Sequence, residues 1–204
     1  MSEYTCVDSF CGAGGLGLGL QQAGLDIRLS FDIDDICIKT IKENEKYFSH
    51  PALVADITDM LKGKALEICK MERGELFLLA GGPPCQGFSI QRRGSDIDSR
   101  NQLVFKYAQL VNELYPKYFV MENVTGIAGK RGKTILEQLI DELKGIGYEV
   151  HINLLDAQDY GVPQGERDTL SLGKERIWVF IMYIQNRTES IVPLEIQSAH
   201  CQSL

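Results

Sequence analysis

The chain has 204 residues, of which 44% are hydrophobic and 24% are charged, and its formal net charge is −7. This size and balance are typical of a globular protein of one domain, or one and a half at most, that buries its own core without disulfide or metal staples. The negative charge argues against a surface built wholly for polyanions, but it leaves room for a local basic groove.

The sequence also argues against a secreted or membrane-bound protein. The longest apolar run, residues 177–184, is far too short to span a bilayer, and the first ten residues lack the regions of a signal peptide. The six cysteines include no CxxC pair and are accompanied by only three histidines, which argues against a metal site. We therefore expect an intracellular protein without membrane contact or bound metal, in which most cysteines are core thiols.

Short apolar strands alternate with helical stretches, which predicts a doubly wound α/β domain with a mostly parallel, Rossmann-like sheet and a late antiparallel strand. In the helix expected over residues 33–44, Ile36, Ile38 and Ile41 are expected near the apolar face. Residues 1–183 are predicted to form this domain, and residues 184–204 form a tail without periodicity. The expected elements are strand 5–10, helix 16–23, strand 27–32, helix 33–44, strand 53–55, helix 64–71, strand 76–80, helix 101–114, strand 118–121, helix 134–144, and strands 149–155 and 176–183.

Motif residues follow the predicted strands directly. Cys11–Gly15, Asp32, Asp56, the Pro84–Cys85 loop and Glu122 all fall at carboxyl ends of strands. In an open α/β sheet that edge binds ligands, so these residues are expected to share one site.

The glycine-rich turn after the first strand predicts a nucleotide-like cofactor. Residues 12–17 fit the pattern GxGxxG, and Asp32 lies 20 residues beyond Gly12. Glycines let the backbone approach a ligand, and the carboxylate can accept the hydroxyls of a ribose. The pattern does not choose between NAD, FAD and S-adenosylmethionine, and a tight turn without a ligand is the alternative.

Asp56 has two interpretations of equal weight. Its carboxylate could accept a hydrogen bond from an adenine amino group, or it could cap a helix, a role that Thr58 or Asp59 could also serve.

Two later segments predict catalytic side chains. Cys85 lies in the segment GGPPCQGFS at 81–89, which is expected to form a rigid loop after the end of a buried strand. In such a loop a thiolate can be exposed and stabilised by amide dipoles. Glu122 ends another apolar strand, where partial burial raises a carboxyl pKa and prepares it to donate a proton. A capping or salt-bridging role is the alternative for Glu122.

A set of basic loop residues either contacts phosphates or forms solvated surface: Arg92, Arg93, Arg100, Lys130, Arg131 and Lys133.

Taken together, these segments resemble the cytosine-C5 DNA methyltransferases over about residues 4–183. The likeness depends on DSFCGAGG at 8–15, Asp32, Asp56-Ile57, GGPPCQGFS at 81–89, MENV at 121–124 and DYGVPQ at 159–164.

The resemblance implies an S-adenosylmethionine-dependent methyltransferase fold, S-adenosylmethionine as the methyl donor, and a cytosine flipped out of double-stranded DNA as the substrate. Cys85 then attacks C6 while Glu122 engages N3 and the exocyclic amine. Gln86, Ser89 and Arg100 are expected toward the DNA. The cofactor residues implied are Phe10, Gly12, Gly14, Asp32, Ile33, Asp56, Ile57, Pro84 and Leu103.

The chain departs from the family pattern in two places. A pocket arginine usually follows DYGVPQ almost at once, but here nine residues intervene before Lys174, so Arg176 is the first choice and Arg167 the second. Members of the family also continue into a target-recognition region and a final Asn-containing segment, which residues 185–204 do not resemble. We therefore expect a catalytic half that needs a second polypeptide. A truncated, catalytically incompetent remnant, an NAD-linked oxidoreductase and an RNA substrate are the alternatives.

Overall fold

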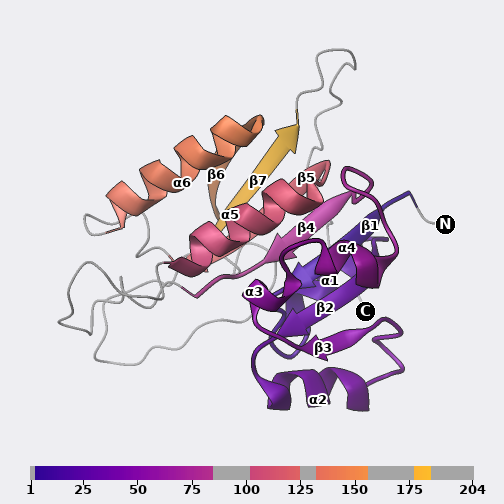
Figure 1. Ribbon diagram of the computed structural model, residues 1–204. Coiled ribbons are helices and arrows are strands. Elements are labelled where there is room, and N and C mark those ends of the chain that lie inside the picture. Colours follow the sequence, from indigo (N-terminus) through magenta and orange to yellow (C-terminus); the bar gives the residue numbers. More distant parts are fainter. Residues whose placement is uncertain (1–2, 85–101, 125–131, 156–176, 185–204) are drawn as a thin grey trace, which may run out of the picture.

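The computed structural model describes residues 3–84, 102–124, 132–155 and 177–184, and within them one seven-stranded sheet runs through the molecule in the order β3-β2-β1-β4-β5-β7-β6 (Figure 1). The first five strands are parallel, and β7 is antiparallel to both of its neighbours. The predicted sheet with a late antiparallel strand is therefore confirmed. The strands are β1 (Thr5–Ser9), β2 (Asp26–Asp32), β3 (Ala52–Val54), β4 (Leu78–Gly81), β5 (Tyr118–Val124), β6 (Tyr148–Leu155) and β7 (Ile177–Ile184).

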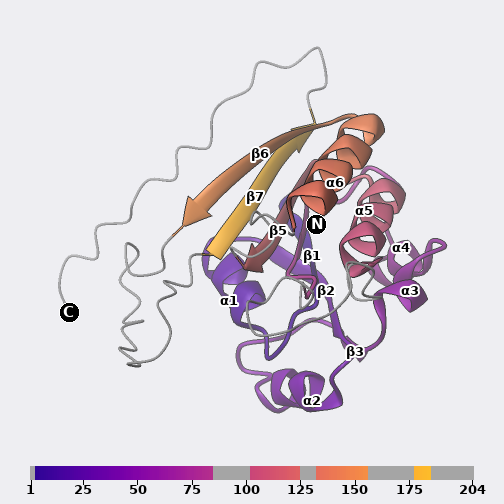
Figure 2. The same cartoon turned by 90° about the vertical axis from the view of Figure 1, so that its left-hand side faces the viewer.

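Helices cover both faces of the sheet. Figure 2 shows the sheet between α1 on one side and the layer that contains α5 and α6 on the other. The larger core lies between the sheet and this second layer, and smaller apolar clusters lie under α1 and α2. No helix of the described residues is long and apolar enough to cross a bilayer. The helices are α1 (Gly15–Gln22), α2 (Asp35–Glu43), α3 (Ile57–Met60), α4 (Lys64–Cys69), α5 (Gln102–Leu114) and α6 (Lys133–Ile146).

The strand order reverses direction between β1 and β4. The chain leaves β1 into α1 on one face and continues after β4 to α5 on the other face. Because these connections diverge, the carboxyl ends of the two strands border a crevice, which is where open α/β sheets bind ligands. Ser9 pairs with Gly81 in this register, so the turn after β1 and the segment after β4 begin side by side.

One predicted core residue is wrong. Ile38 and Ile41 are each 1% exposed, but Ile36 is 70% exposed. Asp34 caps α2 by accepting a hydrogen bond from the Ile36 amide (2.8 Å), so Ile36 lies in the first turn. At about 100° per residue, a position two residues before Ile38 points to the opposite side of the helix.

The cysteines lie mostly where they are expected. Cys6, Cys11 and Cys69 are buried and Cys37 is half-buried, whereas Cys85 and Cys201 lie outside the described residues. Burial raises the pKa of the Cys69 thiol to about 11, so this thiol remains protonated at neutral pH.

Candidate active site

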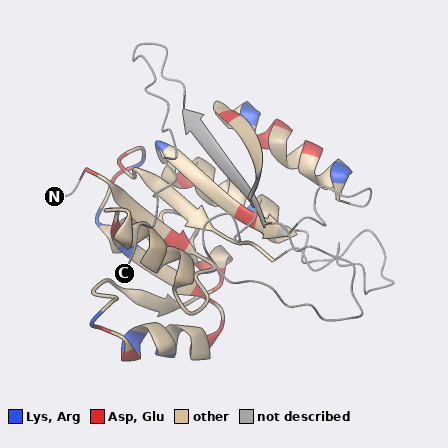
Figure 3. Ribbon diagram, turned by 180° about the vertical axis from the view of Figure 1, so that it is seen from behind, with Lys and Arg blue, Asp and Glu red and all other residues tan. Residues whose placement is uncertain are grey.

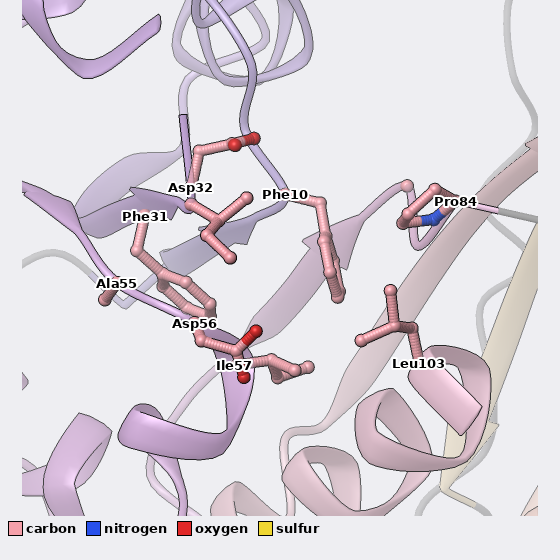
Figure 4. A pocket seen from close by; sticks show the side chains of 10 residues that line it. Phe10, Phe31, Asp32, Ala55, Asp56, Ile57, Pro84 and Leu103 are labelled. Carbon is pink, nitrogen blue, oxygen red and sulfur yellow. The ribbon is translucent and has the colours of Figure 1, made fainter. Parts of the chain in front are cut away.

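A cavity of about 250 Å³ lies at the carboxyl edge of the sheet. Figure 4 shows the carboxylates of Asp32 and Asp56 on one side of it, Pro84 and Leu103 on the other, and Phe10 between them. Its lining residues are Phe10, Phe31, Asp32, Ile33, Ala55, Asp56, Ile57, Gly82, Pro84 and Leu103.

The cavity brings together most of the predicted cofactor residues. Seven of the nine line it, and the two that do not are Gly12 and Gly14. The sequence did not indicate Phe31, Ala55 or Gly82 as lining residues, although each directly precedes or lies within a segment that the family resemblance uses.

Phe10 enters the cavity from a left-handed backbone conformation. Its φ of 53° is uncommon for a residue with a side chain, and such conformations concentrate at functional sites. The residue directly follows β1, and the next amide, that of Cys11, donates to the Phe31 carbonyl of β2 (3.2 Å). The turn therefore stays attached to the neighbouring strand while the ring points into the cavity (Figure 4).

The glycine turn after β1 contacts residues of other elements, which explain why glycine is required there. Gly14 has a φ of 92°, and a Cβ at this position would lie 2.7 Å from the Phe48 ring, so the turn admits no side chain there. Gly12, with a φ of 50°, donates its amide to Asp32 Oδ2 (2.9 Å). The turn thereby fixes the position of Asp32.

Asp32 retains acceptor capacity for a ligand. One oxygen accepts from the Gly12 amide, and the other accepts from the Asp34 amide (2.9 Å). An ionised carboxylate has about four lone-pair sites, so each oxygen can still accept one hydroxyl. This is the arrangement that two adjacent ribose hydroxyls require.

For Asp56, the capping interpretation is confirmed. Its Oδ1 accepts from the Thr58 amide (2.8 Å) and hydroxyl (2.6 Å), and Asp59 completes a capping box by accepting from the Asp56 amide (3.2 Å). Asp59 is thus the reciprocal partner and not the cap itself. An ionised carboxylate has about four lone-pair sites, so Asp56 retains acceptor capacity for a ligand in the cavity that it also lines.

Glu122 lies beside the segment that leads toward Cys85. A Cβ on Gly82 would lie 2.7 Å from Glu122 Oε2, so only glycine leaves room for this carboxylate. Burial raises the pKa of Glu122, and no described residue forms a hydrogen bond or ion pair with it. The capping and salt-bridging alternatives therefore find no support in the described part of the chain. A half-buried carboxyl group of this kind can donate a proton or hydrogen bond to a ligand.

The cavity is acidic. Two carboxylates line it, and none of the described lining residues is Lys or Arg. Figure 3 shows acidic segments near the carboxyl ends of the strands, and both acidic and basic segments on α6. A cationic group is therefore favoured in the cavity over an anionic one.

Several predicted site residues lie outside the described residues: Cys85, Gln86, Ser89, Arg92, Arg93, Arg100, Lys130, Arg131, Arg167 and Arg176. Of the proposed basic groove, only Lys133 is described. It begins α6 and is exposed, and it lies 3.8 Å from Glu137 one turn along the helix. Among the described residues, Lys133 therefore lies on the solvent-exposed side of a helix.

Known proteins resemble this chain over most of its length. The Type II methyltransferase M.XorII of Xanthomonas oryzae pv. oryzae is 39% identical over 179 residues, which cover 86% of this chain and 42% of that protein. M.AquIA of Picosynechococcus sp. is 36% identical, and the match covers 79% of this chain and 68% of that protein. A crystal structure of a prophage-encoded DNA modification methyltransferase from E. coli superposes with a TM-score of 0.73 at 29% identity, covering 92% of this chain and 49% of that one.

The chain therefore spans about two fifths of M.XorII and about half of the E. coli structure. The sequence profile of the C-5 cytosine-specific DNA methylases matches residues 4–187, which include every strand of the sheet and the whole cavity. This chain belongs to the C-5 cytosine-specific DNA methylase family.

Proposed function

We propose that this chain is the catalytic part of an enzyme that transfers a methyl group from S-adenosylmethionine to C5 of cytosine in DNA. The observation that carries the proposal is the acidic cavity at the carboxyl edge of the sheet, with Glu122 beside the segment that leads to Cys85. Membership of the family supports the same reaction.

The cavity suits S-adenosylmethionine better than a dinucleotide. S-adenosylmethionine carries a positive sulfonium, whereas NAD and FAD carry an anionic pyrophosphate, which the two cavity carboxylates would repel. Asp32 has acceptor capacity left for ribose hydroxyls, and the Asp56 carboxylate has acceptor capacity left for an adenine amino group. The apolar walls that we assign to the cofactor are Phe10, Ile33, Ile57, Pro84 and Leu103, while Gly12 and Gly14 hold the turn. When bound, the cofactor supplies an electrophilic methyl group.

The protein side chains make C5 of cytosine reactive. In our proposal the Cys85 thiolate bonds to C6 of a flipped-out cytosine, and the displaced ring electrons move toward N3. Glu122, whose pKa is raised by burial, donates a proton to N3 as charge develops there. C5 takes the methyl group and the N3 proton returns to Glu122. A base then removes the C5 proton, and the C6–sulfur bond breaks to restore the ring and release Cys85.

The remaining family-implied roles stay proposals for residues outside the described ranges. Arg176, or in its place Arg167, completes the cytosine pocket, and Gln86, Ser89 and Arg100 face the DNA. We also propose that a second polypeptide supplies target recognition. The net charge of −7 supports this, because an acidic chain gains little from phosphate attraction.

Calorimetry tests the cofactor half of the proposal. We expect S-adenosylhomocysteine to bind and NADH not to bind. Asp32→Ala should weaken binding by about 1.5–3 kcal/mol, because it removes a charge-assisted acceptor. Glu122→Gln, a change at the carboxylate that we assign to the cytosine, should leave this affinity nearly unchanged. Binding of NADH alone would refute the cofactor assignment, and the reverse pattern in the two variants would mean that the cofactor and cytosine sites are exchanged.

A covalent trap tests the chemistry. A duplex with 5-fluorocytosine in the recognition sequence should form a covalent complex in the presence of cofactor and the recognition polypeptide, because fluorine does not leave as the C5 proton does. Cys85→Ala should abolish the trapped band. An undiminished band would remove Cys85 from its proposed role.

A further inference from the structure

Three buried side chains from three different elements hold the segment that leads to Cys85. Ser9 Oγ donates to the Ala80 carbonyl (2.9 Å), the Tyr107 hydroxyl donates to the Leu79 carbonyl (3.1 Å), and Asn123 Nδ2 donates to the Pro83 carbonyl (2.9 Å). The donors come from β1, α5 and β5, and all three are at most 3% exposed. The end of β4 is therefore fixed from both neighbouring strands and from the helix above it.

Tyr107 makes a second contact through the same hydroxyl. Its hydroxyl also lies 3.0 Å from the Val120 carbonyl of β5, so one oxygen bridges the adjacent strands β4 and β5. Burial raises the pKa of Tyr107 well above its ordinary value, which keeps the hydroxyl protonated and able to donate. A buried hydroxyl is costly unless it is hydrogen-bonded, and this one has a strand carbonyl on either side.

The packing around this bridge is tight. A Cβ on Gly81 would overlap the Ser9 side chain and would lie 3.1 Å from the Tyr107 ring. Gly81 is the last residue of β4 and stands four positions before Cys85. Glu122 follows Val120 by two positions on β5, so the hydroxyl bridges the strand that precedes Cys85 in the sequence to the strand that carries Glu122, two residues before that carboxylate.

We propose that Tyr107 is a positioning residue for methyl transfer, whose hydroxyl sets the spacing between the strand that leads to Cys85 and the strand that carries Glu122. The inference rests on the proposed function, because it assigns the bridge a role in bringing those two groups to one cytosine ring. Displacement of a reacting group by about 1 Å can slow a reaction about 100-fold, so a small change in strand spacing has a measurable effect.

The test compares Tyr107→Phe with Tyr148→Phe in the full chain with its recognition polypeptide. Tyr148 is the matched control, because its buried hydroxyl also donates to a backbone carbonyl, that of Pro116 (2.7 Å), but at the amino end of β5. We expect Tyr107→Phe to lower the single-turnover methylation rate about tenfold and to leave KM for DNA and the cofactor Kd within about twofold. Tyr148→Phe should keep the wild-type rate.

Amide hydrogen exchange of residues 78–84 gives a readout that does not require activity. Tyr107→Phe should speed exchange in this segment about tenfold or more, and Tyr148→Phe should not. If Tyr107→Phe fails to fold, Ser9→Ala, which removes the neighbouring hydrogen bond, should speed exchange in the same segment.

The outcomes separate this inference from the proposed function. A wild-type rate and unchanged exchange in Tyr107→Phe would overturn the inference, as would equal losses of rate in the two tyrosine variants. Failure of the wild-type chain and its recognition polypeptide to methylate any DNA would refute the proposed function instead. The exchange of residues 78–84 would then decide whether the hydroxyl holds the two strands.

Discussion

A buried carboxyl group under the glycine turn predicts an unusual dependence of stability on pH. Asp8 on β1 is 1% exposed, and neither of its oxygens has a hydrogen-bond partner among the described residues that meets ordinary geometry. It faces the first turn of α1, where a Cβ on Gly17 would lie 2.6 Å from Oδ2. Burial raises the pKa of Asp8 to about 7, the charge of Asp32 adds to the rise, and the Gly17 amide offsets part of it.

The size of the effect follows from the two pKa values. In the unfolded chain Asp8 ionises near its ordinary pKa of about 3.9, so between about pH 4 and pH 7 the unfolded state has lost a proton that the folded state still holds. Stability therefore falls as pH rises through this window and then levels off. The full loss is about 4 kcal/mol, of which about 2–3 kcal/mol lies between pH 5 and pH 8.

Asp8→Asn removes this titration and keeps the shape of the side chain. Urea unfolding at several pH values should show the free energy of unfolding of the variant rising relative to wild type by about 2–3 kcal/mol between pH 5 and pH 8. The other titrating groups, Glu122 and His50 among them, are present in both proteins and cancel in the difference. Asp141→Asn, an exposed carboxylate on α6, should follow the wild-type curve. Parallel curves for wild type and Asp8→Asn would refute the argument.

Two glycine positions give further predictions. Gly82→Ala, which places a Cβ 2.7 Å from Glu122 Oε2, should lower the single-turnover methylation rate about tenfold by displacing that carboxylate. Gly145→Ala, with open space around it on α6, is the control and should have no effect. Gly14→Ala should lower the free energy of unfolding by about 2–4 kcal/mol, because left-handed strain and overpacking add. Gly24→Ala, at a similar φ in open space, should lower it by less than about 2 kcal/mol in the same urea titration. Equal losses in the last pair would refute the packing argument.

Periodicity in the sequence predicted the strands and the longer helices because each buries one repeating face or a continuous apolar run. Periodicity missed α3, because a helix of four residues is too short to show a repeat. It also placed Ile36 in the core, because an apolar pattern averaged over the whole helix does not show which residues of the first turn are exposed to solvent. The cap at Asp34 determines where the helix begins, and the position of a helix start is not given by the apolar repeat.

The sequence shows where the glycines are, but it does not show which neighbouring side chains require a glycine at those positions. The GxGxxG spacing indicated that Gly12 and Gly14 allow a ligand to approach, whereas the structure gives Gly14 a neighbour in Phe48 and Gly17 a neighbour in Asp8. These contacts depend on which elements pack together, and a motif read along one strand and its turn contains no information about them.

The same limitation explains why the polar groups beneath the site were not predicted. Asp8 and Ser9 lie in a strand that is buried at all five positions, and sequence patterns assign such a strand to the apolar core. Their role becomes visible only through the strand order, because the pairing of β1 with β4 brings Ser9 to the Ala80 carbonyl across 71 residues of sequence. Buried polar groups persist in a core when they are satisfied or when function requires them. In this fold the hydrogen-bonded Ser9 and Asn123 fix the end of β4, and Asp8, whose oxygens have no partner of ordinary geometry among the described residues, lies under the turn that holds Asp32. These three departures from an apolar core therefore lie beneath the two strand ends to which we assign the nucleophile and the cofactor.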